Sequence, residues 1–181
     1  IQYPHAVPAE QYDAAIGRMT ERVAAMKGVQ SVTQVGGTGT PGISDIDFYV
    51  VFDDNAVVLQ NPVSLLSGED KYLFTHNLFG TSESLALTME QYTFFGKYKL
   101  LHGKPFEPAA ALSSPETEPM RIQVALEYLV KAWVTIQMER NYGVVKIRNL
   151  LLVSKALLHD LALLHTSSGS LWDMLHELVE C

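Results

Sequence analysis

The sequence contains little cysteine and little positive charge. Its single cysteine is Cys181, so no disulfide can form within the chain, which suits a reducing compartment and predicts a cytoplasmic location. Lys and Arg number 13 against 20 Asp and Glu, which gives a net charge of −7. Because long nucleic acids are held mainly by Lys and Arg on their phosphates, this balance argues against a general nucleic-acid binder.

Long uninterrupted apolar runs are also missing. The most aliphatic stretch, around Leu150, is broken by Lys146, Arg148 and Lys155, and this is too much charge for a membrane span. We therefore expect no membrane partner. The chain begins without Met and ends inside a predicted helix, so we expect it to be part of a longer polypeptide.

Apolar spacing divides the chain into an α+β half and a helical half. Helical spacing predicts a helix from about Tyr12 to Met26, ended by Gly28. Short apolar runs predict strands at 29–35, 46–52, 84–88 and 98–101. Prolines between residues 105 and 119 mark a connector, after which the pattern is helical and Trp133 is expected in the core. We predict an α+β domain over residues 1–108 and an all-helical region over residues 109–181.

The most informative segment is a glycine-rich loop that runs into two aspartates, VGGTGTPGISDIDFYVVF at residues 35–52. Side chains alternate along a strand, so Asp45 and Asp47 are expected on one face. Two carboxylates at the start of a strand form the oxygen-rich kind of site that Mg²⁺ shares with substrate phosphates. The glycines before them would let backbone N–H groups approach those phosphates.

The loop also matches two well-known phosphate-binding patterns. Residues 37–42 fit G-x-G-x-x-G, the dinucleotide-binding pattern, and residues 37–44 fit a Walker A motif in which Ile43 replaces the lysine. Both motifs require the loop to open a helix. The β-branched and aromatic residues that follow favour a strand, so these two interpretations are the weaker ones.

The order of helix, strand, Gly-Gly loop and strand with Asp-x-Asp resembles the DNA polymerase β-like nucleotidyltransferase superfamily. The resemblance covers about residues 9–103 in element order, but its specific motif covers only residues 35–52. It implies a mixed β-sheet and makes Asp45 and Asp47 the catalytic residues that hold Mg²⁺. The positions that it implies for contact with the nucleotide are Gly36, Gly37, Thr38 and Ser44.

Two features depart from that family's pattern. The seven residues between Gly37 and Asp45 make a loop shorter than usual. The family also carries a third carboxylate on a later strand, and by resemblance this position falls near Leu85, which cannot bind a metal. Glu83, two residues earlier, is the candidate for the third catalytic carboxylate, since it would share the face of Leu85 if the strand begins there.

The resemblance implies a Mg²⁺-dependent transfer of a nucleoside monophosphate from an NTP, with ATP as the first expectation. The acidic charge of the chain favours a hydroxyl of a small molecule or a protein as the acceptor. The alternative is a catalytically degenerate domain that binds a nucleotide or a protein partner, and the leucine at position 85 is the feature in its favour.

Overall fold

The computed structural model describes residues 1–58, 60–88, 98–105 and 114–164. The chain forms two compact units, one of residues 6–111 and one in which residues 1–5 join residues 112–181. The expected boundary between residues 108 and 109 lies outside the described residues. Within the described ranges, no helix is both long enough and apolar enough to cross a membrane.

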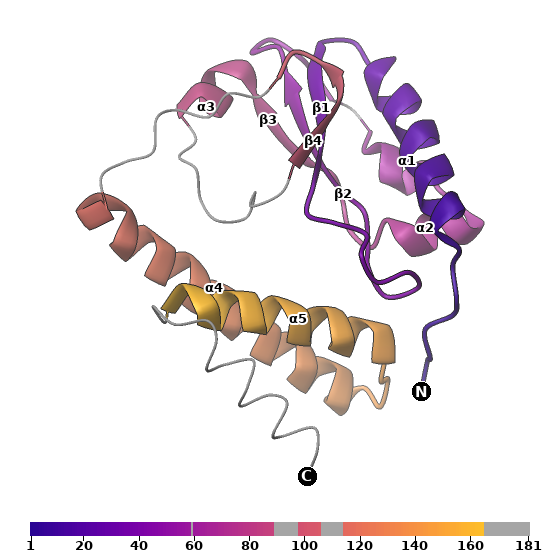
Figure 1. Ribbon diagram of the computed structural model, residues 1–181, viewed down its shortest axis with the longest axis vertical. Helices are drawn as coiled ribbons and strands as arrows, with labels where there is room; N and C mark the ends of the chain where they lie inside the picture. The colour runs from indigo at the N-terminus through magenta and orange to yellow at the C-terminus, as the bar shows by residue number, and fades with distance from the viewer. Residues whose placement is uncertain (59, 89–97, 106–113, 165–181) are drawn as a thin grey trace. The chain divides into compact units, whose positions relative to one another are not determined.

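The first unit is an α+β structure built on a four-stranded mixed sheet, as Figure 1 shows. Its elements are α1 (Ala9–Ala24), β1 (Val29–Val35), β2 (Asp47–Phe52), η1 (Pro62–Leu65), α2 (Gly68–Leu73), β3 (Phe79–Ser82), α3 (Glu83–Thr88) and β4 (Tyr98–Gly103). The strand order is β3-β2-β1-β4. β1 runs antiparallel to β2 and to β4, whereas β2 and β3 are parallel. The expected α+β fold with a mixed sheet is therefore confirmed.

The sheet buries a different cluster on each face, and Figure 1 shows α1 and α3 on opposite sides of it. The predicted first helix is confirmed, because its buried residues recur at helical spacing: Tyr12, Ala15, Met19 and Val23. These residues share the main core with alternate residues of β2, which are Phe48 and Val50. The intervening residues of β2, Tyr49 and Val51, lie in a smaller cluster with Ala86 of α3.

The expected strand at residues 84–88 is wrong, because this segment forms the helix α3. Leu and Ala are good helix formers, so the segment has no strong strand preference. Side chains also satisfy the first backbone N–H groups of the helix. Asp54 Oδ1 accepts from the Ser84 N–H at 2.9 Å, and Ser82 Oγ accepts from the Leu85 N–H at 3.5 Å.

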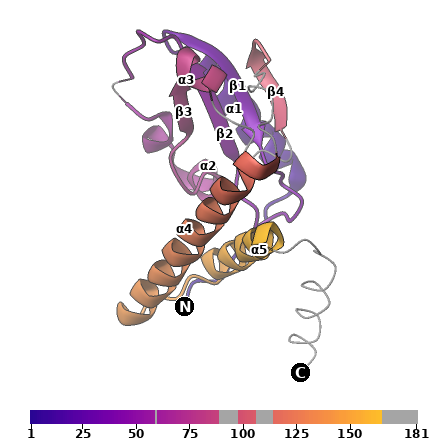
Figure 2. The same cartoon turned by 90° about the vertical axis from the view of Figure 1, so that its left-hand side faces the viewer.

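The second unit contains two long helices, α4 (Ser114–Asn141) and α5 (Ile147–Leu164), which lie side by side in Figure 1 and Figure 2. The helical prediction is confirmed over these residues, and its remainder lies outside the described ones. Among the side chains of α4 that the structure describes, the small residues Ala125 and Ala132 are buried. Trp133 is 64% exposed, so its expected place in the core is wrong in this structure.

Candidate metal centre

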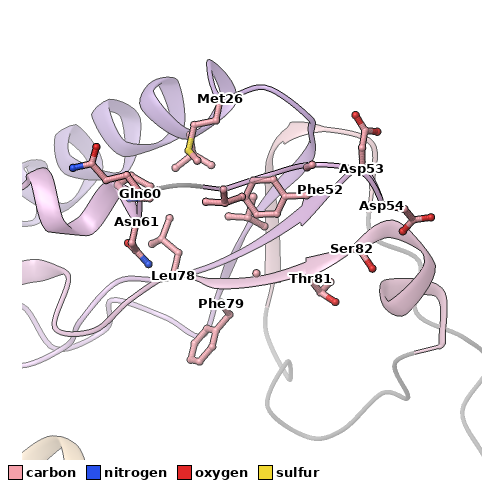
Figure 3. A pocket seen from close by; sticks show the side chains of 16 residues that line it. Met26, Phe52, Asp53, Asp54, Gln60, Asn61, Leu78, Phe79, Thr81 and Ser82 are labelled. Atoms are coloured by element: carbon pink, nitrogen blue, oxygen red, sulfur yellow. The ribbon is translucent and has the colours of Figure 1, made fainter.

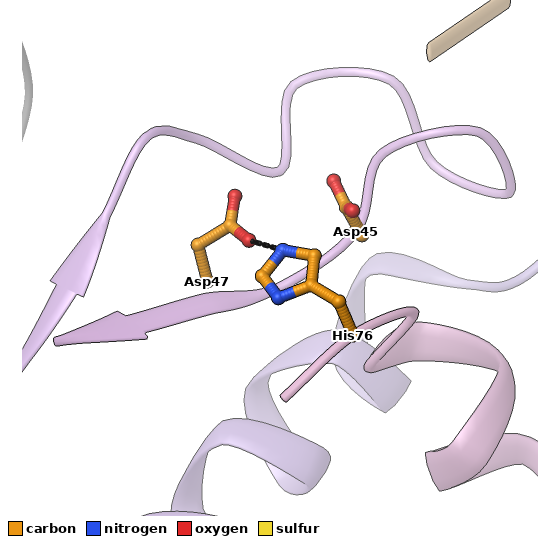
Figure 4. A group of neighbouring side chains, drawn as sticks. All are labelled: Asp45, Asp47 and His76. Carbon is orange, nitrogen blue, oxygen red and sulfur yellow. Dashed lines mark ion pairs between the residues drawn. The ribbon is translucent and has the colours of Figure 1, made fainter. Parts of the chain in front are cut away.

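Asp47 is the first residue of β2, an inner strand of the sheet, and Asp45 lies two residues before it. Ile46 and Phe48 are buried in the main core, so the alternating direction of side chains along this extended segment turns Asp47, and Asp45 before it, away from that core. One carboxylate oxygen of each aspartate and a ring nitrogen of His76 lie within 4.8 Å of one another. Figure 4 shows the three side chains gathered at this point. The predicted shared face of the two aspartates is therefore confirmed, and their third neighbour is a histidine.

The backbone between α2 and β3 brings His76 to the two aspartates. The Ile46 N–H donates to the Leu73 carbonyl oxygen at 3.0 Å, which ties the start of β2 to the end of α2. Phe74 is 2% exposed, and its ring meets that of Phe48 edge-on at a centroid distance of 5.6 Å. Because β3 pairs in parallel with β2, the residues just before β3 lie beside the start of β2.

Polar contacts within this loop orient the three side chains. His76 Nε2 lies 2.6 Å from Asp47 Oδ1 in an ion pair, and His76 Nδ1 lies 2.7 Å from the Asn77 carbonyl oxygen. The Thr75 hydroxyl donates to Asp45 Oδ2 at 2.6 Å. One short loop thus supplies both a neighbour for Asp47 and a hydrogen bond that holds Asp45.

The pKa of His76 is raised to about 9. Its close contact with Asp47 is the largest cause, the Asn77 carbonyl and the charge of Asp45 add to it, and burial opposes it. At neutral pH the ring is therefore positively charged and offsets one of the two carboxylates. Asp47 Oδ1 is buried. Although His76 Nε2 lies close to it in an ion pair, no N–H or O–H group of the described residues is aligned to donate a hydrogen bond to this oxygen.

The Gly36-Gly37 turn lies directly beside this cluster. Val35 pairs with Asp47 across the sheet, so the turn follows at the level of the carboxylate. Gly36 has a φ of +71°, a backbone conformation that residues with a side chain rarely adopt. A Cβ added at Gly36 would lie 3.8 Å from Asp47 Oδ2. A Cβ on Gly37 would meet nothing within 4 Å. The turn therefore leaves an open approach for a ligand beside Asp47.

The other two residues implied for nucleotide contact differ in their placement. Thr38 is half-buried within the loop. Ser44 is 1% exposed, and its hydroxyl accepts from the Thr40 N–H at 3.1 Å. As placed, Ser44 supports the backbone of the loop. This loop leads into β2, not into a helix, so the dinucleotide-binding and Walker A interpretations lack the helix that they require.

Two tyrosines fix the loop to the helices behind it. The Tyr12 hydroxyl donates to the Ser44 carbonyl oxygen at 2.7 Å and accepts from the Gly42 N–H at 3.0 Å. The Tyr72 hydroxyl donates to the Gly42 carbonyl oxygen at 2.7 Å. The glycine loop is thus held at its second half and open at its first.

We expect Tyr12→Phe to lower the free energy of unfolding by about 1–3 kcal/mol, because it leaves a buried carbonyl and a buried N–H without their partner. Urea denaturation of the variant measures this loss. Tyr3→Phe is the matched control, since Tyr3 is 74% exposed. Equal stability of the two variants would contradict the role assigned to the Tyr12 hydroxyl.

The structure does not bring Glu83 to the aspartate pair. Ser82, just before Glu83, pairs with Phe52 at the end of β2, whereas Asp47 begins that strand. At a rise of about 3.3 Å per residue, the two ends of β2 lie roughly 17 Å apart. Glu83 is exposed at the first position of α3. The neighbour of the two aspartates is His76, and not Glu83.

A separate pocket with a volume of about 460 Å³ lies toward the other end of β2. Figure 3 shows Phe52, Asp53 and Asp54 at one side of it and Phe79 at another. Its lining includes neither Asp45 nor Asp47. The centroid of the Phe79 ring lies 4.9 Å from that of the His76 ring, so this one side chain borders both the pocket and the Asp45, Asp47 and His76 cluster.

The donor atoms of the cluster fit a divalent cation. Carboxylates and imidazole are common metal ligands, and the buried Asp47 Oδ1 lacks an aligned hydrogen-bond donor among the described residues. No family model, curated protein or solved structure matches the chain. The chemistry of this site must therefore carry the functional interpretation.

Proposed function

We propose that the protein binds an NTP through a divalent cation held by Asp45 and Asp47, and transfers its nucleoside monophosphate to a hydroxyl. The observation that carries this proposal is the convergence of the two carboxylates beside the Gly36-Gly37 turn. Carboxylates that share a cation with phosphates, next to a flexible glycine turn, suit a triphosphate. The resemblance to the DNA polymerase β-like nucleotidyltransferases gives the reaction type.

In this reaction the acceptor oxygen forms a bond to the α-phosphorus, the bond to pyrophosphate breaks, and the hydroxyl proton passes to solvent. Asp45 and Asp47 would hold the cation, which would supply positive charge to offset that of the phosphates. Asp45 and Asp47 would position the triphosphate, and the Gly36-Gly37 turn would admit it close to the backbone. The Thr75 hydroxyl would keep Asp45 oriented throughout.

The partners in this proposal are ATP as the first nucleotide and a small molecule or a protein as the acceptor. The net charge of −7 disfavours long nucleic acid in that role. A cytoplasmic location remains the prediction from the single cysteine. Mg²⁺ is the cation that the sequence predicts, although that prediction takes no account of His76.

A second candidate function is nucleotide binding without transfer. The observation in its favour is that His76, and not a third carboxylate, lies beside the aspartates within the described residues. Two metal ions about 3.5–4 Å apart need strong negative charge to hold them. A site with two carboxylates and a histidine supplies less of it, and would retain a single cation with its nucleotide.

Calorimetric titration of the protein with ATP, GTP, CTP and UTP tests the proposal, with and without Mg²⁺. We expect cation-dependent binding of at least one NTP, and pyrophosphate release on addition of a suitable acceptor would separate transfer from binding alone. The absence of cation-dependent binding for all four nucleotides would overturn both candidate functions.

We also expect Glu83→Gln to bind NTP as the wild type does, because Glu83 lies at the opposite end of β2 from Asp47. The same titration measures this. A large loss of affinity in Glu83→Gln would show that Glu83 reaches the site after all.

A further inference from the structure

His76 is presented to the aspartate pair with one ring nitrogen already engaged. Its Nδ1 lies 2.7 Å from the Asn77 carbonyl oxygen, a contact that requires a hydrogen on Nδ1. When the ring is neutral, Nε2 therefore carries the lone pair, and Nε2 is the nitrogen that faces Asp47. Metal-binding histidines are commonly oriented in this way, through a hydrogen bond from the other ring nitrogen.

We propose that Asp45, Asp47 and His76 together bind a transition-metal ion of the Mn²⁺ or Co²⁺ kind in preference to Mg²⁺, with His76 Nε2 as the third ligand. Mg²⁺ takes oxygen ligands almost exclusively, whereas an imidazole nitrogen raises the affinity for transition-metal ions. This inference rests on the proposed function only in treating the cluster as a metal centre. It does not depend on the nucleotide or the acceptor.

The distances need only a small adjustment to admit such an ion. Neighbouring ligands at about 2.1 Å from an octahedral ion lie roughly 3 Å from one another. His76 Nε2 and Asp47 Oδ1 are 2.6 Å apart, and all three ligand atoms lie within 4.8 Å of one another. His76 is exposed on a loop, so its ring can move by this amount. Coordination uses the neutral ring, and the proton on Nε2 passes to solvent as the ion enters.

Thr75 has a positioning role in this proposal. Its hydroxyl donates to Asp45 Oδ2 at 2.6 Å, which fixes the carboxylate and leaves Oδ1 for the ion. Hydrogen bonds of this kind to metal ligands typically change metal affinity by about 10–100-fold when they are removed. Thr75→Val should therefore weaken the site, and Thr75→Ser, which keeps the hydroxyl, should restore it.

The test uses Mn²⁺ alone as the probe, without nucleotide. Electron paramagnetic resonance measures the free and bound Mn²⁺, competition gives the affinity for Mg²⁺, and spin-echo modulation detects a directly bound ¹⁴N nucleus. The variants are His76→Gln and the control His102→Gln, a change at an exposed histidine of β4.

We expect wild type and His102→Gln to bind Mn²⁺ at least tenfold more tightly than Mg²⁺ and to show the ¹⁴N modulation. His76→Gln should lose that modulation and about 10–100-fold in Mn²⁺ affinity, with Mg²⁺ affinity changed only a few-fold. Equal affinity for the two ions, modulation retained in His76→Gln, or no Mn²⁺ binding by wild type would overturn the inference.

The two proposals fail separately. Mn²⁺ binding with the expected modulation but without affinity for any NTP would overturn the proposed function and leave the metal preference standing. Two results together would overturn the metal preference and leave the proposed function standing: NTP binding with Mg²⁺ that is unchanged in His76→Gln, and equal affinities of the protein for Mn²⁺ and Mg²⁺.

Discussion

Asp47→Asn is expected to lower metal-dependent NTP affinity by about 100-fold or more, which corresponds to roughly 2.8 kcal/mol. Asp47 is central to the cluster, because Gly36 approaches one of its carboxylate oxygens and His76 approaches the other. Asparagine keeps the shape of the side chain but removes the negative charge that attracts a cation. Isothermal titration with ATP and the divalent ion measures the loss.

The control for this variant is Asp13→Asn, which removes the same charge from an exposed position of α1. It should bind the nucleotide as tightly as the wild type. Circular dichroism of Asp47→Asn should show an unchanged fold, since the side chain is replaced by one of nearly equal size. Nucleotide affinity within a few-fold of the wild type in Asp47→Asn would rule out this carboxylate as a metal ligand.

The largest effect on stability is expected for Gly103→Ala at the end of β4. Gly103 has a φ of +79°, and a Cβ built there would overlap the Gln30 carbonyl oxygen and lie 3.1 Å from the Ser31 Cα. Backbone atoms cannot give way as a flexible side chain can, so β1 and β4 would have to separate locally. We expect a loss of about 3 kcal/mol or more in the free energy of unfolding, measured by urea denaturation.

Gly17→Ala provides the opposite expectation with the same chemical change. Gly17 lies inside α1, and a Cβ there would meet nothing within 4 Å. Alanine should therefore raise the stability by about 0.5–1 kcal/mol through its better helix propensity. A stability change of similar size and sign in the two variants would show that the close approach at Gly103 is not the cause.

The sequence predicted best where periodicity and turn chemistry agree. The apolar stripe from Tyr12 to Val23 repeats at helical spacing, whereas the strand at 29–35 and the Asp-x-Asp strand are short apolar runs rich in β-branched and aromatic residues. The shared face of Asp45 and Asp47 followed from strand alternation alone. Trp133 shows the limit of such patterns, because composition does not say which face of a long apolar helix is covered.

His76 could not be predicted in the same way, because its role depends on a parallel pairing across the chain. The strand that follows it, Phe79–Ser82, is short and contains Gly80 and Ser82, so it has little strand character. Once that strand is paired with β2, the residues before it must lie beside Asp47. A histidine just ahead of a parallel strand is the signal for this position, but the sequence of Phe79–Ser82 does not mark the strand.

The same parallel pairing means that the Asp45, Asp47 and His76 cluster joins the start of β2 to the end of the crossover that leads from β2 to β3. Asp45 and Thr75, which meet at the site, are 30 residues apart in the sequence. An ion bound by both Asp47 and His76 would hold the end of this crossover against the start of β2, because it can bind only while these two segments lie together. At a free concentration 100 times its dissociation constant, such an ion adds about 2.7 kcal/mol against opening of the segment. Binding of the ion would then lower the frequency with which η1 and α2 detach from the sheet, in addition to any part that the ion takes in chemistry.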